Sequence, residues 1–271
     1  GTLITPQHAQ AFKKAGISYV GVSLDGTQTV NDRFRGVAGA FEKAMVGIEN
    51  CRAEGIKVGL RFTITKHNHA EVPEVFRILR EQKIPRVCFY HLVYSGRGSQ
   101  MVGEDLDRQQ TRSVVDRIIN ETALLHRNGY PAEVLTVDNH ADGVYLYLRL
   151  LREDPERAAK VLQLLEYNGG NASGHGIGCV SWDGSVHPDQ FWRHLVLGNV
   201  RERGFADIWT DRDNELLMKI KNKKSHVTGR CARCRWLGIC GGNFRVRAEA
   251  VTGDLWAPDP ACYLSDEEIG L

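Results

Sequence analysis

The stretch IKVGLRFTIT (residues 56–65) decides the fold class, because its side chains alternate in character at every position. Even positions from Ile56 to Ile64 are apolar, whereas the odd positions are charged, polar or small. Successive side chains of a strand point to opposite faces, so this pattern predicts a strand with one apolar and one polar face. ISYVGVSLDG (17–26) repeats the pattern, as expected either for strands that line a polar cavity or for a half-exposed sheet edge.

A third strand is predicted at RVCFYHLVYSG (86–96), and helical patterns separate the three strands. The helix expected at about residues 39–53 places Phe41, Ala44, Ile48 and Cys51 on one face, so Cys51 is predicted to be a core thiol. Neighbouring parallel strands must be joined by a crossover connection, and a helix between two strands is the usual one. We therefore expect an α/β fold, a parallel sheet or barrel with helices outside.

Three domains are expected, at residues 1–103, 104–178 and 179–271. The middle one consists of a long helix over about 104–128, a second helical pair and the glycine-rich stretch YNGGNASGHGIG (167–178). We interpret that stretch as a flexible linker. Beyond it, Asp183-Gly184 between two short β-like runs predicts a hairpin.

Composition excludes several classes of protein. The 271 residues carry a formal charge of +2, and the basic residues are spread along the chain, so no nucleic-acid partner is expected. No apolar run approaches the length of a membrane span, so we expect a soluble protein without a membrane partner. Seven cysteines in a chain of this length favour a reducing, cytoplasmic location over a disulfide scaffold.

Four of the cysteines form a metal-ligand pattern. CARCRWLGIC (231–240) supplies Cys231, Cys234 and Cys240, and Cys262 completes a C-x2-C-x5-C-x21-C spacing. Zinc sites tend to pair two C-x2-C knuckles, so this spacing favours a 4Fe-4S cluster over zinc, with unliganded core thiols as a third interpretation.

The chain resembles the radical SAM enzymes with a C-terminal SPASM or twitch-type extension. The resemblance rests on the cysteine loop and on SLDG (23–26), NDRFRG (31–36), SGRG (95–98), DGSVHPD (183–189) and LGNVRERGFADIW (197–209). It is greatest to the haem d1-forming members, through DNHADGVYL (138–146), GGNASG (169–174), VHPDQFWRHLVLGNVRER (186–203) and DPACYLSDEEIG (259–270).

The resemblance implies the C-terminal part of a partial (βα) barrel, followed by a small cysteine-rich iron-sulfur extension. S-adenosyl-L-methionine (SAM) would lie across the strand ends and be cleaved to a 5′-deoxyadenosyl radical. Ser23, Asp25, Arg35 and Arg61 are the expected SAM-site residues. A hydroxyl can bond the ribose, and a guanidinium can bind the methionyl carboxylate through two hydrogen bonds.

One family motif is missing from these residues. The catalytic cluster of the family is bound by C-x3-C-x2-C, which no three of the seven cysteines form. Because the sequence opens GTLITPQ without Met, we expect the N-terminal part, with a second 4Fe-4S cluster, to be absent. The 271 residues alone are therefore expected not to cleave SAM.

The resemblance further implies a substrate, a didecarboxysirohaem-type tetrapyrrole whose propionates are converted to oxo groups. His187, Trp192, Arg193 and His194 are the expected substrate contacts, because carboxylates favour arginine and iron favours histidine. Asp189 and His187 are the candidates for catalytic groups.

Several functions remain open alternatives to haem d1 formation. They are haem b formation by iron-coproporphyrin decarboxylation, peptide modification, and the non-enzymatic roles of a ferredoxin-like carrier or a zinc-stabilised binding module. A flavodoxin or ferredoxin is expected as the electron donor.

Overall fold

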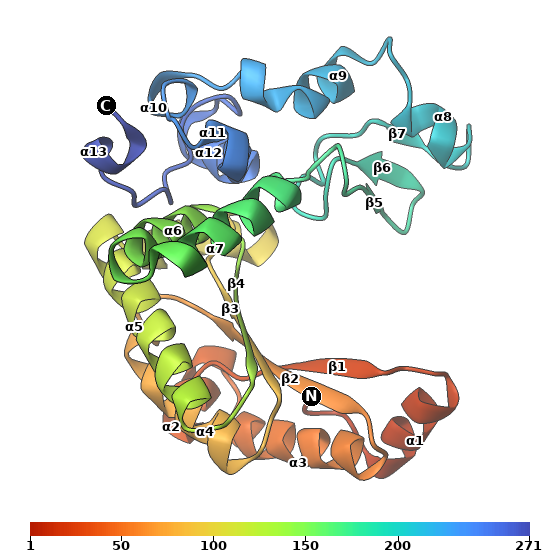
Figure 1. Ribbon diagram of the computed structural model, residues 1–271. Coiled ribbons are helices and arrows are strands. Elements are labelled where there is room, and N and C mark those ends of the chain that lie inside the picture. Colours follow the sequence, from red (N-terminus) through yellow and green to blue (C-terminus); the bar gives the residue numbers. More distant parts are fainter. The chain divides into compact units, whose positions relative to one another are not determined.

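The computed structural model describes all residues, 1–271, and the chain forms two compact units. Figure 1 shows their elements. The first unit contains Gly1–Leu92 and Glu104–Val137, and the second contains Val93–Gly103 and Asp138–Leu271. These boundaries differ from the three expected domains, because the long helix packs on the first unit's core and the glycine-rich stretch packs inside the second unit.

The first unit alternates helices and strands along the chain. Its elements are α1 (Pro6–Lys14), β1 (Tyr19–Ser23), α2 (Gln28–Arg35), α3 (Ala40–Ala53), β2 (Lys57–Thr63), the 3-10 turn η1 (His69–Glu71), α4 (Val72–Glu81), β3 (Arg86–Tyr90), α5 (Arg108–Arg127) and β4 (Glu133–Val137). A further 3-10 segment, η2 (Gly96–Glu104), joins β3 to α5.

Its four strands form one parallel sheet in the order β1-β2-β3-β4. The three predicted strands and the predicted helix at 39–53 are confirmed as β1, β2, β3 and α3. The α/β class with a parallel sheet is therefore as the alternation predicted.

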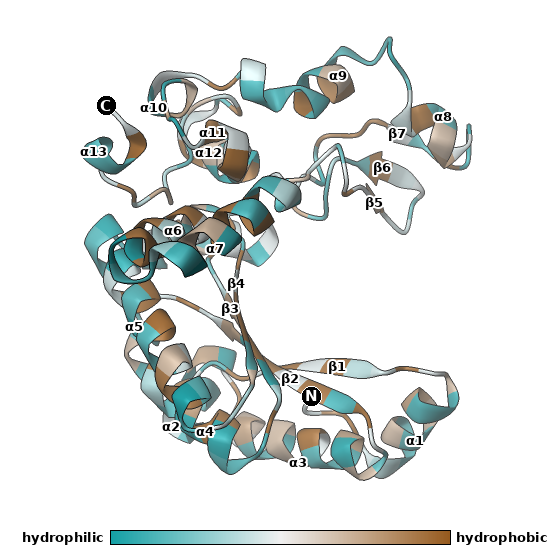
Figure 2. Cartoon of the chain, viewed as in Figure 1, coloured by the Kyte–Doolittle hydropathy of each residue, from teal (hydrophilic) through white to brown (hydrophobic).

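The two faces of the sheet differ as the sequence predicts. Leu60, Phe62 and Phe89 are fully buried and pack against residues of α3, α4 and α5. The Phe62 and Phe89 rings meet edge to face, with centroids 5.6 Å apart, and such aromatic burial stabilises the fold. On the other face Ser23 pairs in register with Arg61, and both are exposed. Hydrophobic and hydrophilic residues are accordingly mixed along β1 and β2 in Figure 2.

The sequence did not predict β4, which pairs with β3 over Glu133–Val137. None of its five residues is fully buried, so no clearly apolar face marks the run as a strand. Ion pairs connect the first residue of β4 to the other strands. The Glu133 carboxylate accepts hydrogen bonds from Lys57 on β2 (2.5 Å) and from Arg86 Nε on β3 (2.7 Å).

The second unit is mainly helical with a small antiparallel sheet, β5-β6-β7. The predicted hairpin around Asp183-Gly184 is confirmed as β5 and β6. The elements are α6 (Ala141–Glu153), α7 (Pro155–Asn168), β5 (Cys179–Val180), β6 (Ser185–His187), β7 (Gly198–Asn199), α8 (Phe205–Trp209), α9 (Glu215–Lys221), η3 (Lys223–Ser225), α10 (Gly229–Ala232), α11 (Leu237–Cys240), α12 (Arg245–Thr252) and α13 (Asp266–Ile269).

Two apolar clusters hold these short elements together. Trp192, Ile220, Phe244 and Val246 belong to one cluster, and Ile208 lies in the other, beside the small sheet. Elements this short have little stability of their own, so the packing of their apolar residues decides their structure.

None of the helices combines the length and the apolar character that crossing a bilayer requires.

The assignment of the sheet faces can be tested by a pair of substitutions. Leu60 is 0% exposed, whereas Leu135 on the opposite face is 43% exposed. Leu60→Ala should lower the free energy of unfolding by about 2–5 kcal/mol through lost burial and a residual cavity. Leu135→Ala should change it by no more than about 0.5 kcal/mol. If urea titrations gave the two variants equal losses in the free energy of unfolding, the two faces of the sheet would be misassigned.

Candidate metal centre

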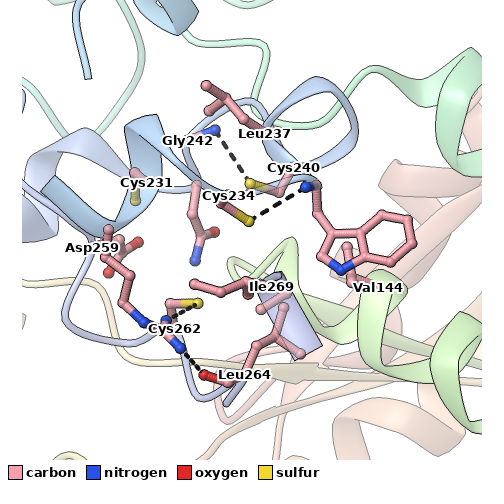
Figure 3. A pocket seen from close by; sticks show the side chains of 14 residues that line it. Val144, Cys231, Cys234, Leu237, Cys240, Gly242, Asp259, Cys262, Leu264 and Ile269 are labelled. Carbon is pink, nitrogen blue, oxygen red and sulfur yellow. Dashed lines mark hydrogen bonds between the residues drawn. The ribbon is translucent and has the colours of Figure 1, made fainter. Parts of the chain in front are cut away.

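Cys231, Cys234, Cys240 and Cys262 line a single pocket in the second unit. The space in the pocket, counted with its opening to solvent, is about 440 Å³. Figure 3 shows the four cysteines around this space, with apolar side chains on its walls. The other lining residues are Ala141, Val144, Arg230, Trp236, Leu237, Gly242, Asn243, Asp259, Leu264 and Ile269. No three of the sulfurs are grouped closely enough to hold a single ion as they stand, so the arrangement is a lined pocket.

Short helices position the first three of these cysteines. Cys231 lies in α10, Cys234 follows that helix, and Cys240 is the last residue of α11. Gly241 ends α11 with a φ of 66°, a left-handed conformation that glycine adopts without strain. The chain can therefore turn back immediately after the third cysteine.

Backbone and side-chain N–H groups point at three of the sulfurs. Trp236 N donates to Cys234 Sγ at 3.4 Å, and Gly242 N donates to Cys240 Sγ at 3.3 Å. Such hydrogen bonds stabilise negative charge on sulfur and tune the potential of a metal held there.

Arg230 supplies the third of these contacts and joins two segments of the site. Its Nη1 donates to Cys262 Sγ at 3.3 Å, its Nε donates to Asp266 Oδ1 at 2.8 Å, and its Nη2 donates to the Leu264 carbonyl oxygen. The guanidinium thus links α10 to the segment that carries the fourth cysteine. Its positive charge also favours the thiolate form of that cysteine.

The burial of these thiols bears on what can occupy the pocket. Burial raises the pKa of the Cys240 thiol to about 12 and also raises the pKa values of Cys234 and Cys262. Without a compensating cation the buried thiolates are unfavourable, because desolvation penalises the charged form. Four soft thiolate donors in an apolar pocket fit an iron-sulfur cluster or zinc, both of which supply that positive charge.

The glycine-rich stretch, expected to be a flexible linker, instead packs against the third cysteine. Asn171 N donates to the Cys240 carbonyl oxygen at 3.1 Å. A Cβ atom on Gly170 would lie 2.3 Å from the Cys240 carbonyl carbon, so only glycine permits this approach. The sequence does not reveal this role, because glycine content alone does not distinguish flexibility from close packing.

A second set of contacts, from the DNHADG stretch, holds the chain on either side of Cys262. Asn139 Nδ2 donates to the Ala261 carbonyl oxygen at 3.0 Å, and the Tyr263 hydroxyl donates to Asp142 Oδ1 at 2.8 Å. Asn139 Oδ1 accepts from Asn243 Nδ2 at 2.8 Å, which ties the same stretch to the loop after Cys240. The four cysteine positions are therefore fixed by segments far apart in the sequence.

The predicted SAM-site residues lie in the first unit and divide into two groups. Ser23, Arg61 and Arg35 carry exposed or partly exposed side chains. Asp25 is 0% exposed, accepts from Thr63 N at 2.9 Å and pairs with Arg35. Burial raises the pKa of Asp25, while the Thr63 N–H and Arg35 act in the opposite direction. Asp25 is therefore engaged by Arg35 and by the backbone of Thr63.

Three of the predicted substrate and catalytic residues are engaged inside the second unit. His187 contacts Ser181 Oγ (2.9 Å) through Nε2 and the Leu195 carbonyl oxygen (3.0 Å) through Nδ1. Trp192 is 1% exposed and donates from Nε1 to Glu249 Oε2 at 2.8 Å. Asp189 is buried and accepts from Ser173 Oγ at 2.5 Å. The polar atoms of these three side chains are therefore engaged by other residues of the second unit.

The other two predicted substrate contacts are exposed. Arg193 stacks over the exposed Trp182 ring, 4.3 Å from its centroid. His194 Nε2 lies 3.0 Å from Glu249 Oε1, so a carboxylate already holds this ring. Arg193 is thus the member of the predicted set that keeps an accessible charge.

Comparisons with known proteins agree with this geometry. Residues 175–235, which include Cys231 and Cys234, match the SPASM family, an iron-sulfur cluster-binding domain. The fold of the chain resembles that of several solved structures. They include anSMEcpe with bound AdoMet and a peptide (TM-score 0.70, 18% identity, covering 99% of this chain and 70% of that one). SuiB of Streptococcus suis bound to its precursor peptide SuiA is also similar (TM-score 0.71, 17% identity, covering 97% and 57%).

Relatives of higher identity define the family. Fe-coproporphyrin III synthase of Methanosarcina barkeri is 62% identical over 100% of this chain and 68% of the relative. Pre-heme d1 synthase of Dinoroseobacter shibae is 40% identical over 100% and 67%. An AdoMet-dependent heme synthase of Nitratidesulfovibrio vulgaris is 28% identical over 97% and 69%.

The fold and these matches define a radical SAM enzyme with a SPASM extension. More narrowly, the chain belongs to the haem-related radical SAM enzymes, the family that includes Fe-coproporphyrin III synthase and pre-heme d1 synthase. The resemblance inferred from sequence is confirmed, and the ferredoxin-like and zinc-module alternatives are not supported.

Packing of the glycine-rich stretch on Cys240 predicts different outcomes for two neighbouring substitutions. Gly169 (φ 71°) and Gly170 (φ 78°) are both left-handed, but nothing lies within 4 Å of a Cβ on Gly169. Gly169→Ala should cost about 1–2 kcal/mol of stability from backbone strain. Gly170→Ala should cost about 1–3 kcal/mol more, because backbone atoms block the methyl group. Thermal unfolding of the two variants measures the difference, and equal midpoints would contradict this packing.

If Cys231, Cys234, Cys240 and Cys262 are the metal ligands, replacing one of them should lower the iron content, whereas replacing another cysteine should not. Cys262→Ala should lower both iron content and thermal stability after anaerobic reconstitution, because metal binding is coupled to folding of the domain. Cys51 is fully buried in the first unit, so Cys51→Ala should keep its iron and lose about 1 kcal/mol of stability through packing. A Cys262→Ala variant that retains the parent's iron content would remove this residue from the set.

Proposed function

We propose that this chain acts in the formation of Fe-coproporphyrin III from an iron tetrapyrrole precursor. The observation that carries the proposal is 62% identity to Fe-coproporphyrin III synthase along the whole chain. Members of one family at this identity usually share their site chemistry, although fold alone would not imply it. The expected haem d1 reaction becomes the second candidate, supported by 40% identity to pre-heme d1 synthase.

Within this proposal the cysteines are the ligands of one 4Fe-4S cluster. Cys231, Cys234, Cys240 and Cys262 would occupy all of its iron corners, which suits electron transfer rather than Lewis-acid binding. Arg230 and the N–H groups of Trp236 and Gly242 would balance the negative charge of the thiolates. A flavodoxin or ferredoxin is the proposed source of electrons.

The first unit would hold SAM at the carboxyl ends of its strands. SAM supplies one-electron hydrogen-abstraction chemistry when it is bound beside a reduced catalytic cluster. Ser23 would bond the ribose, and Arg35, held by the buried Asp25, would bind the methionyl carboxylate. Arg61 projects from the same polar face as Ser23 and would extend this polar surface toward the cofactor.

The peptide-modifying alternative has less support. The solved structures with bound peptides are at most 18% identical to this chain, so their likeness concerns the fold. The haem-related relatives reach 62% and 40% identity over its full length.

The proposal predicts a specific product. The complete gene product, reconstituted anaerobically, should convert a didecarboxysirohaem-type iron tetrapyrrole to Fe-coproporphyrin III when SAM and a reductant are present. Liquid chromatography with mass spectrometry identifies the product, and omission of SAM is the control. A product with oxo groups in place of propionates would select the haem d1 reaction. SAM cleavage without any change in the tetrapyrrole would contradict both.

A further inference from the structure

His140 lies in the turn that follows the last strand of the parallel sheet. β4 ends at Val137, and His140 caps the N-terminus of α6. Asp138, in the same turn, has a φ of 69°, a left-handed conformation that is rare outside glycine.

The backbone of His140 is held firmly within the second unit. His140 N donates to Asn243 Oδ1 at 2.9 Å. Asn139 and Asp142, its neighbours in the DNHADG stretch, bond the segment around Cys262. The residues on either side of His140 therefore bind other parts of the second unit.

The imidazole ring itself makes no hydrogen bond within residues 1–271. It stacks on the ring of Phe244, at 5.9 Å between centroids and 13° between planes. Phe191 meets the same Phe244 ring edge to face at 5.7 Å. Neither ring nitrogen of His140 therefore has a hydrogen-bond partner in these residues, and two aromatic side chains of the kind that pack on a flat macrocycle lie nearby.

The surroundings keep this ring neutral at physiological pH. Burial lowers the pKa of His140 to about 4, and the positive charges of Arg247 and Lys223 act in the same direction. Asp142 and Asp259 oppose the shift and do not reverse it. A neutral imidazole is the form that binds metal, because its free nitrogen carries the lone pair.

The two histidines expected from sequence to contact the tetrapyrrole are less suited to iron. Both ring nitrogens of His187 are occupied, and His194 Nε2 is paired with Glu249. The turn after β4 therefore presents the better donor.

We propose that His140 is the protein ligand to the iron of the tetrapyrrole substrate. The inference rests on the proposed function, since it requires an iron tetrapyrrole to bind. It assigns the DNHADG stretch two tasks, with Asn139 and Asp142 holding the cysteine-bearing segments and His140 holding the substrate iron.

A binding titration separates this role from a purely structural one. The complete gene product, without SAM, is titrated with iron(III)-coproporphyrin III and with metal-free coproporphyrin III, and followed by visible absorbance and electron paramagnetic resonance. His140→Phe keeps a ring to stack on Phe244 but has no nitrogen donor. It should weaken binding of the iron porphyrin by at least about tenfold, change the iron resonance signal, and leave the metal-free porphyrin within about twofold of the parent.

Two further variants complete the test. Imidazole added to His140→Ala should restore the parent's iron signal, and His194→Ala should keep that signal throughout. An unchanged iron signal and affinity in His140→Phe would overturn the inference while leaving the proposed function intact. If the parent protein bound neither porphyrin, the proposed function itself would fail, and the assignment of His140 would fall with it.

Discussion

The gathering of four partly buried thiols in one apolar pocket is the constraint on which the second unit depends. The sulfurs come from a short loop and from Cys262, and burial raises the pKa values of Cys234, Cys240 and Cys262, that of Cys240 to about 12. A bound cluster would offset the cost of ionising these thiols and tie the loop to the returning segment. Arg230, the glycine-rich stretch and the DNHADG stretch all contact these segments, so their conformations follow from the same requirement.

The first unit meets a different requirement, since it must bury one face of its sheet and keep the other polar. Leu60 and Phe62 build the covered face, and Ser23 and Arg61 occupy the opposite one. A polar sheet face beside Arg35, which pairs with the buried Asp25, suits a charged nucleoside cofactor, and the cysteine pocket suits electron transfer. These two kinds of site are what a radical SAM enzyme of the haem-related family needs for redox chemistry on a tetrapyrrole.

Sequence patterns predicted the parts that depend on local periodicity. The alternation in residues 56–65 predicted both the strand and its two faces, and the cysteine spacing predicted which four thiols share a pocket. The patterns did not predict β4 or the contact of Asn139 with Asn243, because that contact joins residues 104 positions apart. They also favoured His187 and His194 as ligands, since nearness in sequence does not reveal which ring nitrogens are already engaged.

Metal analysis of the anaerobically reconstituted chain tests most directly whether the four cysteines hold one cubane cluster. Iron and acid-labile sulfide assays combined with Mössbauer spectroscopy should give about four irons and four sulfides per chain, with every iron in a thiolate-ligated cubane environment. One tightly bound zinc ion with no labile sulfide would contradict the account and make the pocket a structural metal site.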